Sequence, residues 1–196
     1  MRMRSLAVCC LLALAAATAS GDPPKTAPGA LSPELEATIE ALSVRPQHQQ
    51  LARFAGDWTW TAKMWMGPPV ESRGTMRAEM MFGGRYLEQH STGEMLGKPF
   101  EGRSTLGYDP VDQRFVATSI ELGSGTGLMM QTGTCDEGAT RCTFSGTYWA
   151  PGSGQQNPVR SVLSWTSDDS FKSEAYATGP NGAEMKVAEL VMTRQR

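Results

Sequence analysis

The sequence has few of the residues on which common catalytic and metal sites depend. Its 196 residues include only two histidines and four cysteines. It contains no HExxH, no Gly-x-Ser-x-Gly, no Walker loop and no dinucleotide-binding fingerprint. Residues 123–127, GSGTG, have the composition of a phosphate loop, but no helical pattern follows them, which favours a hairpin loop. We therefore expect neither a metal site nor a cofactor.

A block of charge of one sign is also missing. The chain has 18 basic and 20 acidic residues, for a formal net charge of −2. The electrostatic attraction that underlies nucleic-acid binding requires clustered Lys and Arg. The sequence therefore argues against nucleic acid as a partner.

Long apolar runs are absent except near the N-terminus. There, residues 6–16 are apolar, follow Arg2 and Arg4, and precede the small residues Ala17-Thr18-Ala19. This is the pattern of a secretory signal peptide, and the run is well short of the ~20 residues of a membrane span. We expect a signal peptide over residues 1–19, cleavage near Ala19, no transmembrane segment, and a periplasmic or secreted protein.

Cleavage at that point would remove Cys9 and Cys10 and leave Cys135 and Cys142. The six residues between this pair, DEGATR, are typical of a hairpin turn. In an oxidising compartment the pair predicts a disulfide that joins two neighbouring strands. The alternative, half of a metal site, lacks a second cysteine pair.

Helical periodicity is confined to the first part of the chain. Residues 20–46 combine a Pro/Gly/Ala-rich flexible lead-in with a short helix that starts after Ser32, and a second short helix precedes Gly56. From residue 57 onward, about ten alternating segments are separated by turn signals. Successive hairpins favour closure, because closure removes unpaired strand edges. We predict an all-β domain over residues 47–196, an up-and-down antiparallel barrel of about ten strands, with a sandwich as the alternative.

The segment RFAGDWTWTAKMWM shows the alternation most clearly. Its apolar residues fall on one side of a strand: Phe54, Gly56, Trp58, Trp60, Ala62, Met64 and Met66.

Several segments together resemble the bacterial domain of unknown function family 1579. They are HQQLARFAGDW, GGRYL, PFEGRSTLGYD and a closing MTR, and the resemblance covers roughly residues 48–194. It implies a lipocalin-like, or calycin-like, barrel and no particular activity. In such barrels the tryptophan of a Gly-x-Trp strand packs across the closed end, so Gly56 and Trp58 are expected to have this structural role.

A ten-strand barrel is wider than one that side chains alone fill, and many of its predicted inward residues are small. We therefore predict a lumen that binds a small apolar or amphipathic molecule, without catalysis. The residues expected to line it are Trp60, Met64, Met66, Met76, Met80, Arg85, Gln89, Phe100 and Tyr108.

The orientation of residues 85–90 depends on the preceding turn. A two-residue turn at Gly83-Gly84 sends Arg85, Leu87 and Gln89 inward, whereas a three-residue loop sends Tyr86, Glu88 and His90 inward. We favour the first arrangement, in which Arg85 could bind a ligand carboxylate.

Two other functions remain open on the sequence. An enzyme acting on a small hydrophobic substrate would use Glu88, His90 and Tyr108 as candidate catalytic residues, and a carboxylate such as Glu88 or Glu121, if buried, would have a raised pKa. An interaction module of the cell envelope, or an oligomer, would use apolar residues on the outer face. His48, on the second helix, is expected to fix that helix to the barrel.

Overall fold

The structure is a computed structural model that describes residues 31–65, 68–122, 127–149, 154–179 and 181–196. The predicted signal peptide with its cleavage site, and Met66 among the predicted lining residues, lie outside the described residues. The chain divides into two units between Thr38 and Ile39. The first unit contains the start of helix α1 (Pro33–Ala41), where the Ser32 hydroxyl accepts the Leu35 amide at 3.2 Å and caps the helix.

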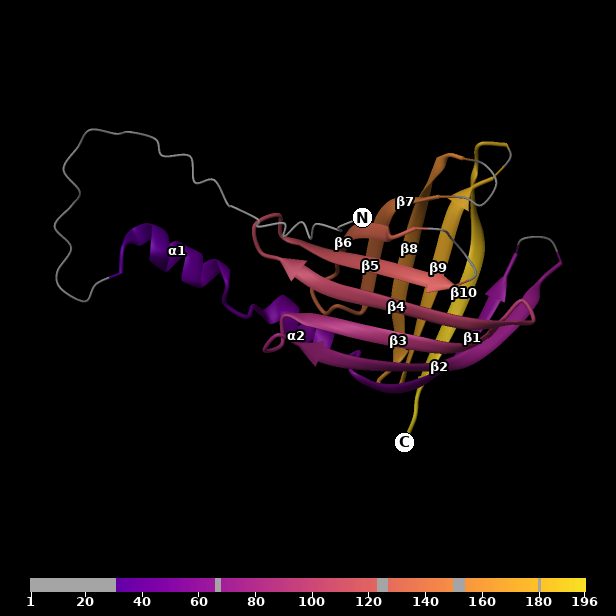
Figure 1. Cartoon of the computed structure of the whole chain (residues 1–196), viewed down its shortest axis with the longest axis horizontal. Helices are drawn as coiled ribbons and strands as arrows, with labels where there is room; N and C mark the ends of the chain where they lie inside the picture. The colour runs from indigo at the N-terminus through magenta and orange to yellow at the C-terminus, as the bar shows by residue number, and fades with distance from the viewer. Residues whose placement is uncertain (1–30, 66–67, 123–126, 150–153, 180) are drawn as a thin grey trace, which may run out of the picture. The chain divides into compact units, whose positions relative to one another are not determined.

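The second unit contains helix α2 (Pro46–Ala52) and ten strands that form a closed antiparallel barrel (Figure 1). The strands are β1 (Gly56–Met64), β2 (Val70–Met81), β3 (Tyr86–Met95), β4 (Lys98–Asp109), β5 (Arg114–Leu122), β6 (Met129–Cys135), β7 (Arg141–Trp149), β8 (Gln156–Ser167), β9 (Ser170–Thr178) and β10 (Glu184–Arg194). Each strand pairs with its neighbours in the chain, and β1 closes the barrel against β10 with Trp58 opposite Arg194. The predicted up-and-down barrel is confirmed.

The alternation of apolar and polar residues along each strand determines which side chains face the interior of the barrel. In β1, Trp58, Trp60, Ala62 and Met64 are buried, whereas the residues between them are exposed. The period of two matches the pleat, so one face forms the core and the other meets water.

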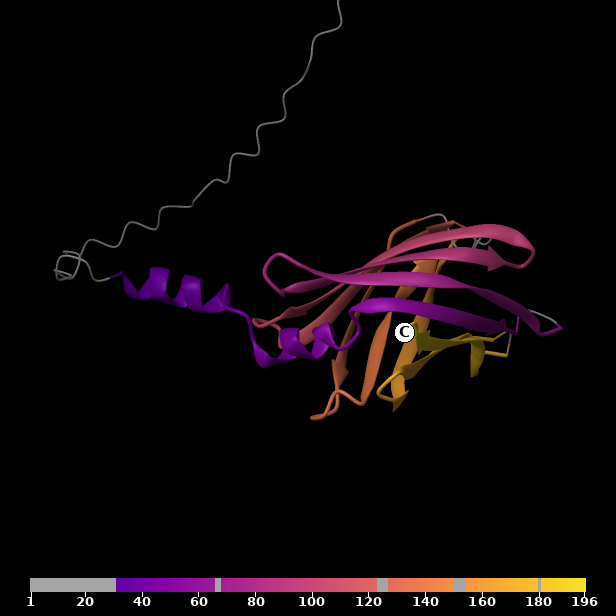
Figure 2. The same ribbon diagram turned by 90° about the horizontal axis from the view of Figure 1, so that it is seen from below.

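The two ends of the barrel differ. We define the base as the end where β1 begins and β10 ends, and the mouth as the opposite end. Helix α2 lies at the base and contacts β2, β3 and β4 (Figure 2). The mouth has no such helix in the part of the chain that the structure describes.

The predicted disulfide is present in the turn region of the base. Cys135, at the end of β6, lies directly opposite Cys142 on β7, and the two are bonded. No helix in the described ranges is long and apolar enough to cross a membrane.

Candidate functional site

Trp58 closes the base of the barrel. Its side chain is 0% exposed, and its indole Nε1 donates a hydrogen bond to the Phe54 carbonyl at 3.0 Å. The rings of Trp165 and Phe171 lie 6.0 Å and 4.9 Å from it. This aromatic cluster fills the interior at this end, which is the structural role expected of Trp58.

Arg194 at the end of β10 holds this cluster together. Its guanidinium lies 4.1 Å above the Trp58 ring and donates to the carbonyls of Ala55 at 2.8 Å and Arg53 at 2.9 Å. The last strand is thereby tied to the segment that precedes the first. Sequence reasoning assigned no role to Arg194, although it ends the MTR segment.

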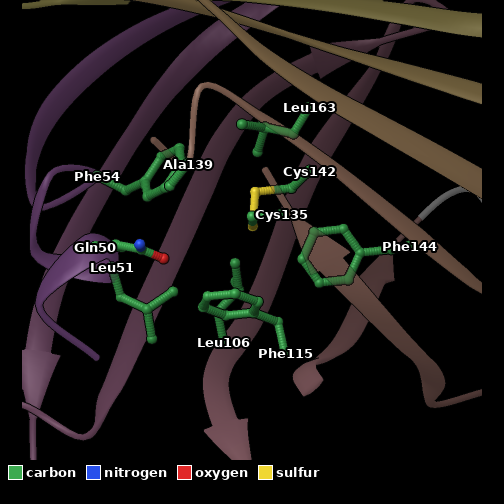
Figure 3. A pocket seen from close by; sticks show the side chains of 10 residues that line it. All are labelled: Gln50, Leu51, Phe54, Leu106, Phe115, Cys135, Ala139, Cys142, Phe144 and Leu163. Atoms are coloured by element: carbon green, nitrogen blue, oxygen red, sulfur yellow. A yellow bond between two sulfur atoms is a disulfide. The ribbon is translucent and has the colours of Figure 1, made fainter. Parts of the chain in front are cut away.

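A small apolar cavity lies between α2 and the barrel floor (Figure 3). Its volume is about 10 Å³, which is about the space of one water molecule. Figure 3 shows the disulfide among the side chains that line it: Gln50, Leu51, Phe54, Leu106, Phe115, Cys135, Ala139, Cys142, Phe144 and Leu163. It is too small for a ligand, so the base is packed core.

His48 fixes α2 to the base. It is 4% exposed, and its Nδ1 accepts the Arg45 amide at 2.8 Å. Burial lowers the pKa of His48, which favours the neutral ring that can accept this hydrogen bond.

Tyr108 belongs to the same packing and not to the predicted ligand site. Its ring lies 5.7 Å from the His48 ring and 5.1 Å from that of Phe115. Tyr108 thus lies near the end of β4 beneath α2, and not beside the other residues predicted to line the ligand site.

The β2–β3 turn orients the strand whose direction the sequence left open. Met81 pairs with Tyr86, so residues 82–85 form a four-residue turn. In the favoured two-residue hairpin, Phe82 would pair with Arg85. That pair is not formed here, but the next one, Met81 with Tyr86, is the same in both arrangements, so the register of the two strands is unchanged. Leu87 is fully buried and Gln89 faces inward, whereas Tyr86 faces outward.

Arg85 is therefore not in the lumen, and the predicted inward position of its side chain is wrong. It lies in the turn, where its Nε donates to the Leu42 carbonyl at 2.8 Å and its Nη1 to the Phe82 carbonyl at 3.0 Å. Its charge serves to hold the segment before α2 against the turn.

Glu88 and His90 face outward, contrary to what a catalytic role inside the barrel requires. Glu88 lies 3.7 Å from Arg103, and His90 Nε2 lies 3.0 Å from Glu101 Oε1. His90 also borders an open, polar groove of about 300 Å³ on the outer face of β1–β3. The enzyme hypothesis thus loses the residues on which it depended.

Most of the predicted aromatic and thioether residues pack together along the inside of β1, β2 and β4 and form a wall. Trp60 is 2% exposed, its Nε1 donates to the Thr75 carbonyl at 3.0 Å, and its ring lies 5.7 Å from that of Phe100. A Cβ on Gly74 or Gly93 would lie 2.4 Å or 2.8 Å from the Trp60 ring, so the indole occupies the space that side chains there would fill. The wall consists of Trp60, Met76 and Phe100, with Met80 packed against them; Met64 is buried farther along β1 toward the mouth.

Most of the remaining inward positions toward the mouth carry small or polar side chains that are only partly buried; Met129, Leu190 and Tyr148, which follows Gly146 on the inner face of β7, are larger. We refer to this region as the mouth half of the lumen. Its inward-facing residues, by register and burial, are Ser91, Ser104, Ser119, Glu121, Met129, Tyr148, Ser161, Ser173, Ala175 and Leu190.

Two hydrogen-bonded pairs mark the floor of the mouth half. The Ser104 hydroxyl donates to Gln89 Oε1 at 2.8 Å, and the Gln131 amide donates to the Ser161 hydroxyl at 3.0 Å. Gln131 is 6% exposed and was not predicted from the sequence. Its alternation with Met129 and Gly133 is the signal that could have placed it inward.

Glu121 on β5 faces the lumen opposite Gly102 on β4. Burial raises the pKa of its carboxyl. Within the described ranges, the Glu121 carboxyl has no hydrogen-bond or ion-pair partner. The same part of the chain contains no group of three or more His, Cys, Asp or Glu side chains that could hold a metal ion.

A closed up-and-down barrel with a helix at its base and a Gly-x-Trp first strand defines a lipocalin-like protein. The chain belongs to the family described as "Protein of unknown function (DUF1579)", whose family model matches residues 43–194. The resemblance noted in the sequence is thereby confirmed. A comparison with curated proteins finds no match.

Two solved structures have a similar fold. The crystal structure of Rv2717c from M. tuberculosis matches with a TM-score of 0.60 and 14% identity, covering 79% of this chain and 100% of that one. The S-type phycobiliprotein lyase CPES from Guillardia theta matches with a TM-score of 0.52 and 10% identity, covering 81% and 97%. At these identities the likeness concerns the fold alone.

Proposed function

We propose that the protein binds a small apolar or amphipathic molecule in the mouth half of its lumen. The observation that carries the proposal is the contrast between the two halves of the interior. Aromatic side chains fill the base, whereas most inward-facing residues of the mouth half are small or polar and only partly buried.

The chemistry of the lining supports an amphipathic ligand. One side is the apolar wall, beyond which Met64 lies toward the mouth, and Met129 faces the lumen from β6; methionine side chains are flexible and polarizable and adapt to different ligand shapes. The other side presents serine hydroxyls, the Gln131 amide and the Glu121 carboxyl. A mostly apolar surface with a few convergent polar groups is the usual composition of a small-molecule site.

The rim of the mouth is also apolar. Beside or within each of the five mouth connections lies a large apolar side chain that is between 39% and 66% exposed. They are Val70, Leu96, Leu128, Trp149 and Met185. At the base, two of the four turns expose a large apolar residue, Phe82 at 71% and Val111 at 79%. An apolar rim suits the passage of an apolar ligand.

We further propose that the protein acts outside the cytoplasm. The signal-peptide pattern and the Cys135–Cys142 disulfide support this location, because disulfides persist mainly in oxidising compartments. Detection of the mature protein in a periplasmic or culture fraction, with an N-terminus near residue 20, tests it. An uncleaved protein in the cytoplasm would contradict it.

Binding can be tested with the fluorescent apolar amine N-phenyl-1-naphthylamine. In Ala175→Trp the indole projects into the mouth half, since Ala175 faces inward opposite Ser161. We expect this change to weaken dye binding at least about tenfold. The matched control is Ser145→Trp on the exposed outer face of β7, which should bind as the wild type does.

The proposal fails if the wild-type protein does not enhance the dye's fluorescence. It fails equally if both variants bind the dye with wild-type affinity. Circular dichroism of each variant confirms that the barrel is intact.

A further inference from the structure

Among the residues that the structure describes, Glu121 is the carboxylate that faces the lumen, and no basic side chain pairs with it. We propose that the bound molecule carries a positively charged head group that pairs with Glu121, while its apolar part lies along the wall formed by Trp60 and Phe100. This inference rests on the proposed function and specifies the chemical class of its ligand as a cationic amphiphile.

The position of Glu121 suits this role. It lies on β5 in the mouth half, one inward position beyond Ser119, and its partner across the ladder is Gly102. A Cβ at Gly102 would lie 3.0 Å from Phe100 Cζ and 3.3 Å from Glu121 Cβ. Because Gly102 has no side chain, the aromatic ring and the carboxylate-bearing chain approach each other across it. A cation paired with Glu121 would thus carry its apolar part directly onto the Phe100 end of the wall.

Around Glu121, the strands that the structure describes turn no basic side chain into the lumen. On the neighbouring strands β4 and β6, the inward-facing residues nearest to Glu121 are Phe100, Gly102, Ser104, Met129 and Gln131. The charged residues next to Gly102 in sequence, Glu101 and Arg103, face outward and pair with His90 and Glu88. Lys98 lies farther out, exposed at the rim.

An unpaired, partly buried carboxylate is unfavourable, and desolvation alone raises the pKa of Glu121. A ligand cation would compensate for that desolvation, because a charge-assisted hydrogen bond is stronger at a site from which water is excluded. A ligand carboxylate would be repelled at the same position. Arg85 is held in the turn at the base, and no described inward-facing position of the mouth half carries an arginine that could bind an anionic head.

The test compares three ligands with the same tail and different heads: n-decylammonium, n-decanol and n-decanoate. Calorimetric titration is carried out below their micellar concentrations at about pH 8, where exposed carboxyl groups are fully ionised. For the wild-type protein we expect decylammonium to bind at least about tenfold more tightly than decanoate, with decanol between them.

Two variants identify the group responsible. Glu121→Gln should weaken decylammonium binding about tenfold, leave decanol unchanged, and remove the discrimination against decanoate. Glu94→Gln is the matched control, since Glu94 is exposed on the outer face of β3, and it should behave as the wild type.

The inference is overturned if decanol binds but decanoate binds as tightly as decylammonium. It is also overturned if Glu121→Gln keeps the wild-type preference for decylammonium. If none of the three ligands binds the wild-type protein, the proposed function itself fails and the inference with it.

Discussion

At the scale of single residues, Gly56 is where the backbone, a cation and an aromatic ring meet. Its φ is +126°, and a Cβ there would lie 2.8 Å from Arg194 Nη1. Arg194 cannot easily move aside, because it is bonded to the carbonyls of Arg53 and Ala55 and lies over Trp58. Glycine is therefore required for two independent reasons, its φ and its lack of a side chain.

We expect Gly56→Ala to lower the free energy of unfolding by about 2–3 kcal/mol. Urea unfolding followed by tryptophan fluorescence measures this change. Gly84→Ala is the control, because Gly84 also has a positive φ, +89°, but a Cβ there would have no atom within 4 Å. It should cost about 1 kcal/mol, from backbone strain alone. Equal losses in the two variants would contradict the role assigned to Arg194.

The position of a single side chain could be predicted from the sequence where the residue lies within a strand, but not where it lies at the end of one. Alternation placed Trp58 and Trp60 inside, because strand faces are determined by a period of two. Arg85 and Tyr108 were misplaced, because one lies in a turn and the other beneath a helix that no strand pattern describes. Arg194 was overlooked, since its partners are backbone carbonyls about 140 positions away in sequence.

At the scale of elements, the β6–β7 hairpin is held by its disulfide. Cys135 and Cys142 are opposite each other and separated by seven positions, so the closed loop is short. Short loops lose little conformational entropy in the unfolded chain, which limits the stabilisation to about 2 kcal/mol.

We therefore expect Cys135→Ala/Cys142→Ala to lower the melting temperature by several degrees and to leave the barrel folded. Differential scanning calorimetry measures the shift, and circular dichroism reports the fold. Added reductant should lower the wild-type melting temperature similarly and leave the double variant unchanged. Loss of the barrel in the double variant would show that the hairpin depends on more than loop entropy.

The β2–β3 hairpin shows which properties of an element the sequence determines. Its register followed from Gly83-Gly84, so Leu87 and Gln89 were correctly placed inside. The length of the turn could not be predicted from the sequence, because the register is the same whether or not Phe82 and Arg85 form a pair. That single pair decides whether residue 85 belongs to a strand or to a turn, and hence whether its charge lies at the ligand site.

At the scale of the whole molecule, the interior is divided into a packed base and an accessible mouth half. The number and order of strands could be predicted, because ten alternating segments joined by turns favour closure. The division itself could not, since it depends on how Trp60 lies over Gly74 and Gly93 and on the contact between α2 and the floor. The proposed ligand site depends on this division.

Thiol labelling measures the division most directly and requires no ligand. Ala175→Cys introduces a thiol in the mouth half, and Ser145→Cys introduces a thiol on the outer face. Ala78→Cys introduces a thiol nearer the base, at a position that is 2% exposed. The labelling rate is measured with a small methanethiosulfonate reagent, and the labelling of the wild-type protein is subtracted. The rate for Ala175→Cys should lie within about tenfold of the rate for Ser145→Cys, and it should be at least about a hundredfold higher than the rate for Ala78→Cys. If Ala175→Cys reacts as slowly as Ala78→Cys, the mouth half is closed to solvent and the account of an accessible lumen is contradicted.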